Sequence, residues 1–134
     1  MENLKATVVI PNLNGAAWLK DSIESIYAQT EKSFELIVVD NGSTDQSLDI
    51  ARSYQNRENY TLIENGKNTG FSFAVNQGIS LAKAPFVLLF NNDAFAQPDL
   101  LAELLLTAGT DDKIFAVQAC IISQYDRTQS DYAG

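Results

Sequence analysis

Short runs of apolar residues alternate along this chain with longer segments in which apolar residues recur every three or four positions. The runs predict five strands, at 7–10, 34–39, 60–64, 86–90 and 114–122. Two of them, 34–39 and 86–90, are apolar without alternation, which is typical of strands buried on both faces of a parallel sheet. The run at 60–64 alternates, and we expect it nearer an edge of the sheet.

The segments between the runs predict helices, because their apolar positions fall on one helical face. These segments are 16–29, 43–54, 73–82 and 98–106. Ser43 or Thr44 can cap the second helix, while Pro11 and the Asn14-Gly15 turn signal end the first strand. Alternation of strand and helix implies crossover connections. We therefore predict an α/β fold, a mainly parallel sheet with helices on both faces.

The length of 134 residues suits one domain with a single core, predicted at 1–122, followed by a polar tail at 123–134. The formal net charge is −8, and the nine Lys and Arg residues are scattered. A nucleic-acid or anionic-membrane surface needs a basic patch, so neither is expected here. No run approaches the roughly 20 apolar residues of a membrane span, and we expect a cytoplasmic protein.

The chain contains no histidine and one cysteine, Cys120. The absence of histidine excludes a histidine general base and the common zinc sites. Cys120 lies in the apolar run 114–122, where we expect a buried, unreactive thiol rather than a nucleophile.

Polar residues directly follow two of the predicted strands. Asp40 ends the run 34–39, and Asn91-Asn92-Asp93 ends the run 86–90. In open α/β sheets ligands bind outside the carboxyl ends of the strands, so the two carboxylates are expected to share one crevice. Asp93 suits Mg²⁺ or Mn²⁺, which bind through one or two carboxylates plus substrate phosphates. The alternative for Asp93 is a simple turn.

Three further residues each allow a functional and a structural interpretation. Asp40 can accept a hydrogen bond from a nucleobase N–H, or it can stabilise a turn before the next helix. For Asp45 the start of a helix is favoured, since the helix dipole stabilises a negative charge in the first turn. Gly70 either lets a ligand approach the backbone or supplies a positive φ in a turn.

Five segments between residues 6 and 106 carry a pattern, in order and with suitable spacing. They read VVIPNLNG at 8–15, QT at 29–30, FELIVVDNGSTD at 34–45, NTGF at 68–71 with NQG at 76–78, and LLFNND at 88–93 with PD at 98–99. Together they resemble the family 2 glycosyltransferases, particularly the rhamnosyltransferase-like members. No G-x-G-x-x-G follows the first strand, so a dinucleotide site is not expected.

The resemblance implies a glycosyltransferase A-type fold whose nucleotide-binding half is Rossmann-like. It implies inverting transfer of a sugar from a nucleotide-diphosphate donor to a glycan or lipid-linked acceptor, with Mg²⁺ or Mn²⁺ held by Asp93. Asp40 would contact the base, Pro11 and Leu13 would lie against the base and ribose, and Asn92 would lie near the ribose or phosphate. The full set of implied nucleotide-sugar-binding residues is Pro11, Asn12, Leu13, Asn14, Asp40, Gly70, Asn92 and Asp93.

Two departures from the family pattern bear on function. Asn92 is neutral where the commoner motif is Asp-x-Asp, which removes one negative charge from the cation site. Family members also continue into an acceptor-binding half that carries the catalytic base, whereas Asp126 and Asp131 here match no motif, so the base is unassigned. We therefore expect this chain to be the donor- and metal-binding part of an enzyme of cell-surface glycan synthesis, with the tail beginning the acceptor-binding half.

Two more expectations follow from that interpretation. The complete enzyme would lie in the cytoplasm, without a membrane span and peripherally at the inner membrane. A sheet edge and apolar surface meant for the acceptor-binding half would favour self-association of this chain. The alternative to an enzyme is a non-catalytic nucleotide-sugar-binding module or a partner subunit.

Overall fold

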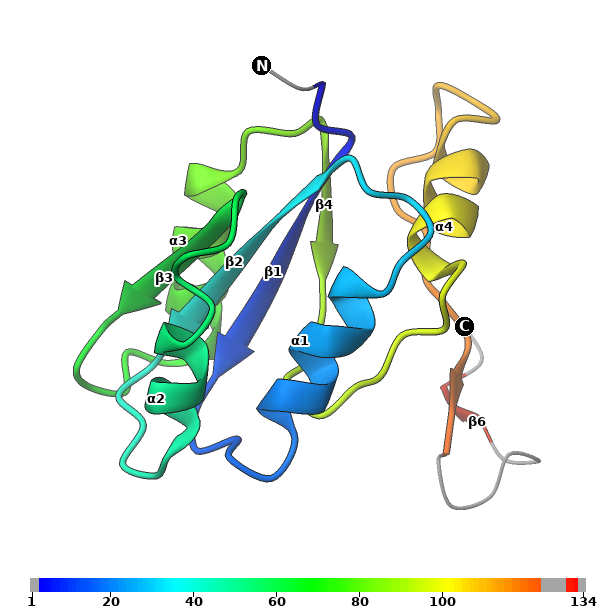
Figure 1. Cartoon of the computed structure of the whole chain (residues 1–134). Helices are drawn as coiled ribbons and strands as arrows, with labels where there is room; N and C mark the ends of the chain where they lie inside the picture. The colour runs from blue at the N-terminus through cyan, green and yellow to red at the C-terminus, as the bar shows by residue number, and fades with distance from the viewer. Residues whose placement is uncertain (1–2, 124–129, 133–134) are drawn as a thin grey trace.

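A computed structural model describes residues 3–123 and 130–132 of the chain, and its centre is a four-stranded parallel sheet (Figure 1). The strand order is β3-β2-β1-β4. The strands are β1 (Ala6–Asn12), β2 (Phe34–Asp40), β3 (Tyr60–Glu64) and β4 (Phe86–Leu89). The predicted α/β class is confirmed, and so is the edge position of the strand at 60–64, which pairs only with β2.

The two central strands carry the core. All seven residues of β2 are buried, as its unbroken apolar run predicts. β1 extends two residues beyond its predicted end at Ile10, through Pro11 to Asn12. The backbone groups of successive β1 residues point alternately toward β4 and toward β2. The Val9 carbonyl accepts a hydrogen bond from the Phe90 N–H on the β4 side, and the Asn12 carbonyl accepts one from the Asn41 N–H on the β2 side. Pro11 therefore faces the β4 side after that ladder has ended, where its missing N–H costs nothing.

Helices cover both faces of the sheet (Figure 1). They are α1 (Leu19–Tyr27), α2 (Ser47–Arg52), α3 (Phe71–Leu81) and α4 (Leu100–Ala108). Side chains of α1, α2 and α4 share one buried cluster with alternate residues of β1 and β2, whereas α3 packs on the other face through Ala74. Gly78 lets α3 approach closely, since a Cβ there would lie 2.4 Å from Val9 Cγ1.

The helix boundaries differ from those predicted at 16–29 and 43–54. Helix α1 begins three residues later, because residues 16–18 form a turn. The predicted caps of α2 are wrong: its N-cap is Gln46, without a side-chain cap hydrogen bond. The Ser43 hydroxyl instead donates to the Asp40 carboxylate, and its oxygen accepts from Asn12 Nδ2 and the Asn14 N–H rather than from an N–H of α2.

The predicted strand at 114–122 is mostly wrong. Only β5 (Ile121–Ile122) is a strand, and it pairs with the short antiparallel β6 (Ser130–Tyr132). Residues 114–120 have no partner strand in the described part of the chain, so Phe115 is fully exposed and Cys120 is exposed rather than buried. Of the predicted polar tail 123–134, including Asp126, residues 124–129 and 133–134 lie outside the described residues.

The strand β4 is also less buried than its apolar run predicts. Phe86, Val87 and Leu89 are 44%, 39% and 52% exposed. The cause is position, because β4 pairs only with β1 and forms an edge of the described sheet.

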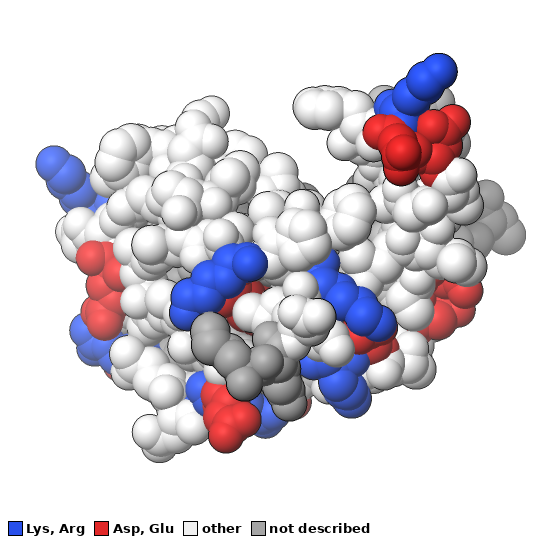
Figure 2. Space-filling view, turned by 90° about the horizontal axis from the view of Figure 1, so that it is seen from above, with Lys and Arg blue, Asp and Glu red and all other residues white. Residues whose placement is uncertain are grey.

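The exterior is mixed in charge where it is seen from above the amino ends of the strands. Across this face Lys and Arg side chains lie beside Asp and Glu (Figure 2). None of the described helices is long and apolar enough to cross a membrane.

Candidate functional site

A cavity of about 470 Å³ opens at the carboxyl ends of β1, β2 and β4. Ligands of open parallel sheets bind at this end. Residues from four loops and from the start of α3 line it: Pro11, Asn12, Leu13, Asn41, Asn68, Gly70, Phe71, Ala74, Asn91, Asn92 and Asp93. Two apolar strand-end residues, an aromatic ring, several amides and one carboxylate therefore converge on one hollow.

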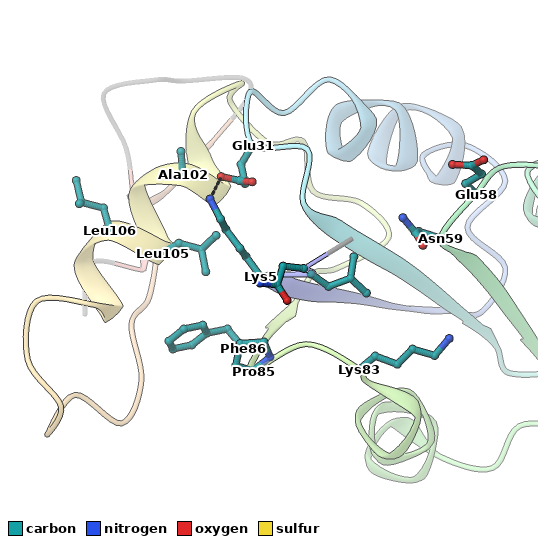
Figure 3. Close-up of a pocket in the computed structure, with 12 residues that line it drawn as sticks. Lys5, Glu31, Glu58, Asn59, Lys83, Pro85, Phe86, Ala102, Leu105 and Leu106 are labelled. Carbon is teal, nitrogen blue, oxygen red and sulfur yellow. Dashed lines mark hydrogen bonds and ion pairs between the residues drawn. The ribbon is translucent and has the colours of Figure 1, made fainter. Parts of the chain in front are cut away.

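A larger hollow, of about 1140 Å³, lies at the opposite end of the sheet (Figure 3). Lys5 and Glu31 form an ion pair of 3.1 Å at its wall, and Phe86, Leu105 and Leu106 add apolar surface. It lies beside the amino ends of the strands, where parallel sheets do not bind their ligands. The smaller cavity is therefore the candidate site.

Asp40 lies at the end of β2, but its side chain is buried and does not line the cavity. Its Oδ1 accepts hydrogen bonds from Asn12 Nδ2 (2.9 Å) and Ser43 Oγ (2.6 Å). Its Oδ2 accepts from the backbone N–H groups of Gly42 (3.2 Å) and Ser43 (3.0 Å). The carboxylate thus holds the turn after β2. A contact with a nucleobase requires one of these donors to give way, and it stays a prediction.

The segment after β1 contributes one apolar wall and one turn. Pro11 and Leu13 line the cavity, and Leu13 is 42% exposed. Asn14 has a positive φ of 54°, and its Oδ1 accepts hydrogen bonds from the backbone N–H groups of Thr44 (2.8 Å) and Asp45 (3.3 Å). Asn14 therefore ties the turn after β1 to the turn after β2.

Asp45 completes this junction. Its carboxylate accepts hydrogen bonds from the Ser47 hydroxyl and backbone N–H and from the Ala16 N–H. Partial loss of solvent raises the pKa of the exposed Asp45 carboxyl, but the hydrogen bonds from Ser47 and Ala16 outweigh it and lower that pKa below its ordinary value. Asp45 thus stabilises both loops rather than only the first turn of a helix.

Asn41 forms the opposite wall and was not singled out from the sequence. Its Oδ1 accepts hydrogen bonds from Thr69 N (3.0 Å) and Thr69 Oγ1 (2.6 Å), and its Nδ2 donates to Asn68 Oδ1 (2.9 Å). Gln77 pairs its amide with Asn65 at 2.7 and 2.9 Å, which ties the loop after β3 to α3. The sequence shows several amide residues near strand ends, but this indicates little about Asn41 unless its hydrogen-bond partners are known.

Two glycines allow the loop 65–70 to take its position. Gly42 has φ +86°, and a Cβ there would lie 2.6 Å from the Lys67 backbone, so no other residue fits without displacing the loop. Gly70 has φ +89° and precedes the first turn of α3. The positive-φ interpretation of Gly70 therefore holds, and its position on the cavity wall also leaves the backbone accessible.

Asn91, Asn92 and Asp93 follow β4 on the remaining side. Ser22 Oγ donates to the Asn91 carbonyl oxygen (3.1 Å), and Asn92 Nδ2 donates to Asn12 Oδ1 (2.9 Å). Among the described residues, nothing donates a hydrogen bond to the Asp93 carboxylate or forms an ion pair with it, and the residue is exposed at the cavity.

The donor set of this loop suits a hard divalent cation only in part. The described residues contain no cluster of three Asp, Glu, His or Cys residues that could hold a metal alone. One carboxylate with neighbouring amide oxygens matches the way Mg²⁺ and Mn²⁺ bind when phosphates supply the remaining ligands. Asp93 could therefore hold such an ion only together with a phosphate ligand.

Comparisons with a family model, with curated relatives and with solved structures all match this chain to glycosyltransferases. The model of the family described as Glycosyl transferase family 2 matches residues 7–133. A putative glycosyltransferase, EpsH of Bacillus subtilis, is 30% identical over 109 residues, covering 81% of this chain and 32% of the relative. The chain spans about a third to two fifths of the length of the curated relatives compared with it.

Solved structures share the fold. TarS from S. aureus (residues 1–349), crystallised with UDP and with UDP-GlcNAc, superposes with a TM-score of 0.69 and 28% identity, over 75% of this chain and 30% of TarS. The mannosyltransferase PcManGT from Pyrobaculum calidifontis, in complex with GDP-Man and Mn²⁺, superposes with a TM-score of 0.79 and 25% identity. That likeness covers 96% of this chain and 38% of the mannosyltransferase.

Proposed function

Because this chain belongs to glycosyl transferase family 2, we propose that it binds a nucleotide-diphosphate sugar in the cavity at the carboxyl ends of β1, β2 and β4. The observation that carries the proposal is the placement of Asp93. It is the one carboxylate among the described lining residues, it is exposed, and amides and apolar side chains surround it. Relatives with solved structures bind UDP, UDP-GlcNAc and GDP-Man.

Different parts of the donor would contact the apolar and the amide surfaces of the cavity. Pro11, Leu13 and Phe71 offer apolar surface on which a base and ribose can lie, and Leu13 and Phe71 are exposed before any ligand binds. Asn68 and Asn91 add polar groups for ribose hydroxyls or phosphate oxygens. Helix α3 begins at Phe71, which lines the same hollow, and the amino end of a helix favours an anion.

Charge explains why a cation is part of this proposal. None of the described residues that line the cavity is Lys or Arg, and the chain carries a net charge of −8. A diphosphate entering beside Asp93 would meet like charge unless Mg²⁺ or Mn²⁺ accompanied it. Asp93 would hold this ion with the diphosphate, and the ion would supply Lewis-acid stabilisation of the leaving diphosphate.

The whole enzyme is proposed to transfer the sugar, with inversion, to a glycan or lipid-linked acceptor. A base would remove the proton of the acceptor hydroxyl as that oxygen attacks the anomeric carbon. In the described part of this chain no carboxylate other than Asp93 lines the cavity, so we assign that base to no residue here. The protein would act in the cytoplasm, peripherally at the inner membrane.

Calorimetric titration with UDP, dTDP, GDP and ADP, each with and without Mn²⁺, tests donor binding. We expect one diphosphate to bind in the presence of Mn²⁺ and to bind much more weakly without it. Binding of none of the four would contradict the proposal. Incubation with the corresponding nucleotide sugar then separates the two candidate functions: slow release of free nucleotide indicates a transferase site, whereas a binding module returns the donor intact.

A further inference from the structure

The segment 91–98 joins β4 to α4 and passes beside α1 (Figure 1). None of its residues belongs to a helix or a strand, so no regular ladder of hydrogen bonds supports its backbone. The segment nevertheless forms one wall of the cavity at the carboxyl ends of the strands, through residues 91–93. Its position therefore depends on hydrogen bonds from other parts of the chain.

Two serines on one face of α1 hold the first part of this segment. The Ser22 hydroxyl donates to the Asn91 carbonyl oxygen at 3.1 Å. The Ser25 hydroxyl oxygen accepts from the Ala96 N–H at 3.0 Å, while its proton is donated to the Ser22 carbonyl oxygen at 2.7 Å. Residues three positions apart are neighbours on a helix surface, so both hydroxyls reach the same segment.

Gln29, two residues after α1, holds the end of the segment and the start of α4. Its Nε2 donates to the carbonyl oxygens of Gln97 (2.7 Å) and Ser25 (3.1 Å), and its Oε1 accepts from the Leu101 N–H (2.8 Å). These backbone partners determine which end of the amide is the NH₂ group. Gln29 is 1% exposed, so water does not replace it in these contacts.

Gln29 therefore has two separable effects. The Leu101 N–H belongs to the first turn of α4, and the N-cap of α4, Asp99, makes no side-chain cap hydrogen bond. Gln29 caps this helix instead, from 72 positions earlier in the chain. The hydrogen bond to Gln97 is the second effect, and it acts on the segment that carries the cavity wall.

We propose that Gln29 is a positioning residue for nucleotide binding: with Ser22 and Ser25 it holds segment 91–98 in its binding position before a ligand arrives. The inference rests on the proposed function and adds residues that do not themselves line the cavity. A wall that is already ordered raises affinity, because binding does not have to order it. The effect should fall on the diphosphate beside Asp93 rather than on the base.

Four variants separate positioning from a general loss of stability. Gln29→Met keeps an unbranched side chain of similar size but removes all three hydrogen bonds. Ser25→Ala removes only the acceptor of the Ala96 N–H and is the milder change. Leu105→Ala weakens the packing of α4 on the core while keeping every hydrogen bond of Gln29. Gln55→Met, at an exposed glutamine, is the matched control.

Amide hydrogen exchange, measured by NMR on the protein without ligand, is the first readout. We expect Gln29→Met to speed exchange of the Ala94 and Ala96 N–H groups about tenfold, although Gln29 contacts neither of them. Leu105→Ala and Gln55→Met should leave the exchange of both groups unchanged. Faster exchange in Gln29→Met at Leu101 alone would show that Gln29 only caps α4, and would overturn the inference.

The second readout compares each nucleoside diphosphate with its nucleoside, UDP with uridine and GDP with guanosine, in the presence of Mn²⁺. We expect Gln29→Met and Ser25→Ala to weaken binding of the diphosphate about tenfold, because the binding-competent state is less populated, and to leave nucleoside affinity unchanged. Leu105→Ala and Gln55→Met should match the wild type.

Three outcomes of this comparison would overturn the inference. Wild-type diphosphate affinity in both Gln29→Met and Ser25→Ala would refute the positioning role and leave the proposed function intact. An equal loss for nucleoside and diphosphate would indicate a general structural effect of these residues. Absence of binding of either diphosphate by the wild type would overturn the proposed function together with the inference.

Discussion

Gly78 lies inside α3, where glycine weakens a helix, yet alanine at this position should destabilise the protein. A Cβ at Gly78 would lie 2.4 Å from Val9 Cγ1 and 3.1 Å from Val9 Cγ2. Val9 is fully buried on β1 between two neighbouring strands, and its β-branched side chain has little freedom to rotate. Alanine gains about 1 kcal/mol in helix propensity, whereas overpacking a core costs about 1–3 kcal/mol. The free energy of unfolding should therefore fall by about 1 kcal/mol.

Urea unfolding followed by the fluorescence of Trp18, the single tryptophan, measures this change. Ser72→Ala, at an exposed position of the same helix, controls for propensity and should leave stability unchanged or slightly higher. Val9→Ala removes the two methyl groups that the new Cβ meets. The double variant should therefore lose less stability than the sum of the single variants, by about 1 kcal/mol. A Gly78→Ala protein more stable than the wild type would refute the close packing of α3 on β1.

Two further predictions concern stability and association. Asp45→Ala should lower the free energy of unfolding at pH 7 by about 1 kcal/mol, because the hydrogen bonds that its carboxylate accepts from the Ala16 and Ser47 backbone are lost. Because the folded-state pKa of Asp45 is lowered, its contribution to the free energy of unfolding is present above about pH 4 and is lost as the pH falls through the folded pKa. The urea unfolding curves of variant and wild type should therefore converge at low pH. Equal separation of the curves at pH 3 and pH 7 would contradict this. The exposed β4 edge should cause concentration-dependent self-association in sedimentation, reduced by Leu89→Lys, and a strictly monomeric wild type at high concentration would count against it.

The sequence predicted the elements whose signal is local. The unbroken apolar run at 34–39 became the fully buried β2, and the polar residues that follow β2 and β4 lie at one end of the sheet. The strand predicted from the apolar run at 114–122 was mostly wrong, because an apolar composition does not indicate whether a partner strand is present. Residues 114–120 have none in the described chain, and Cys120 is exposed.

The detail of the site depended on contacts that no local pattern contains. The Ser43 side chain could accept a hydrogen bond from a helix N–H as a cap or donate one to the Asp40 carboxylate, and the charge of Asp40 decided the outcome. Asn12 reaches Asp40 across 28 positions and Asn92 across 80. Amides at strand ends were visible in the sequence, but their orientation required the carboxylates at the other end of the network.

The cation-dependent binding of a nucleoside diphosphate at Asp93 is the central claim, and one calorimetric comparison tests it most directly. UDP and GDP are titrated with Mn²⁺ into the wild type, Asp93→Asn and Asp112→Asn, the last an exposed aspartate outside the cavity. We predict Mn²⁺-dependent binding of at least one nucleotide by the wild type and by Asp112→Asn, and loss of that binding in Asp93→Asn. Equal nucleotide affinity in Asp93→Asn and the wild type would contradict the account.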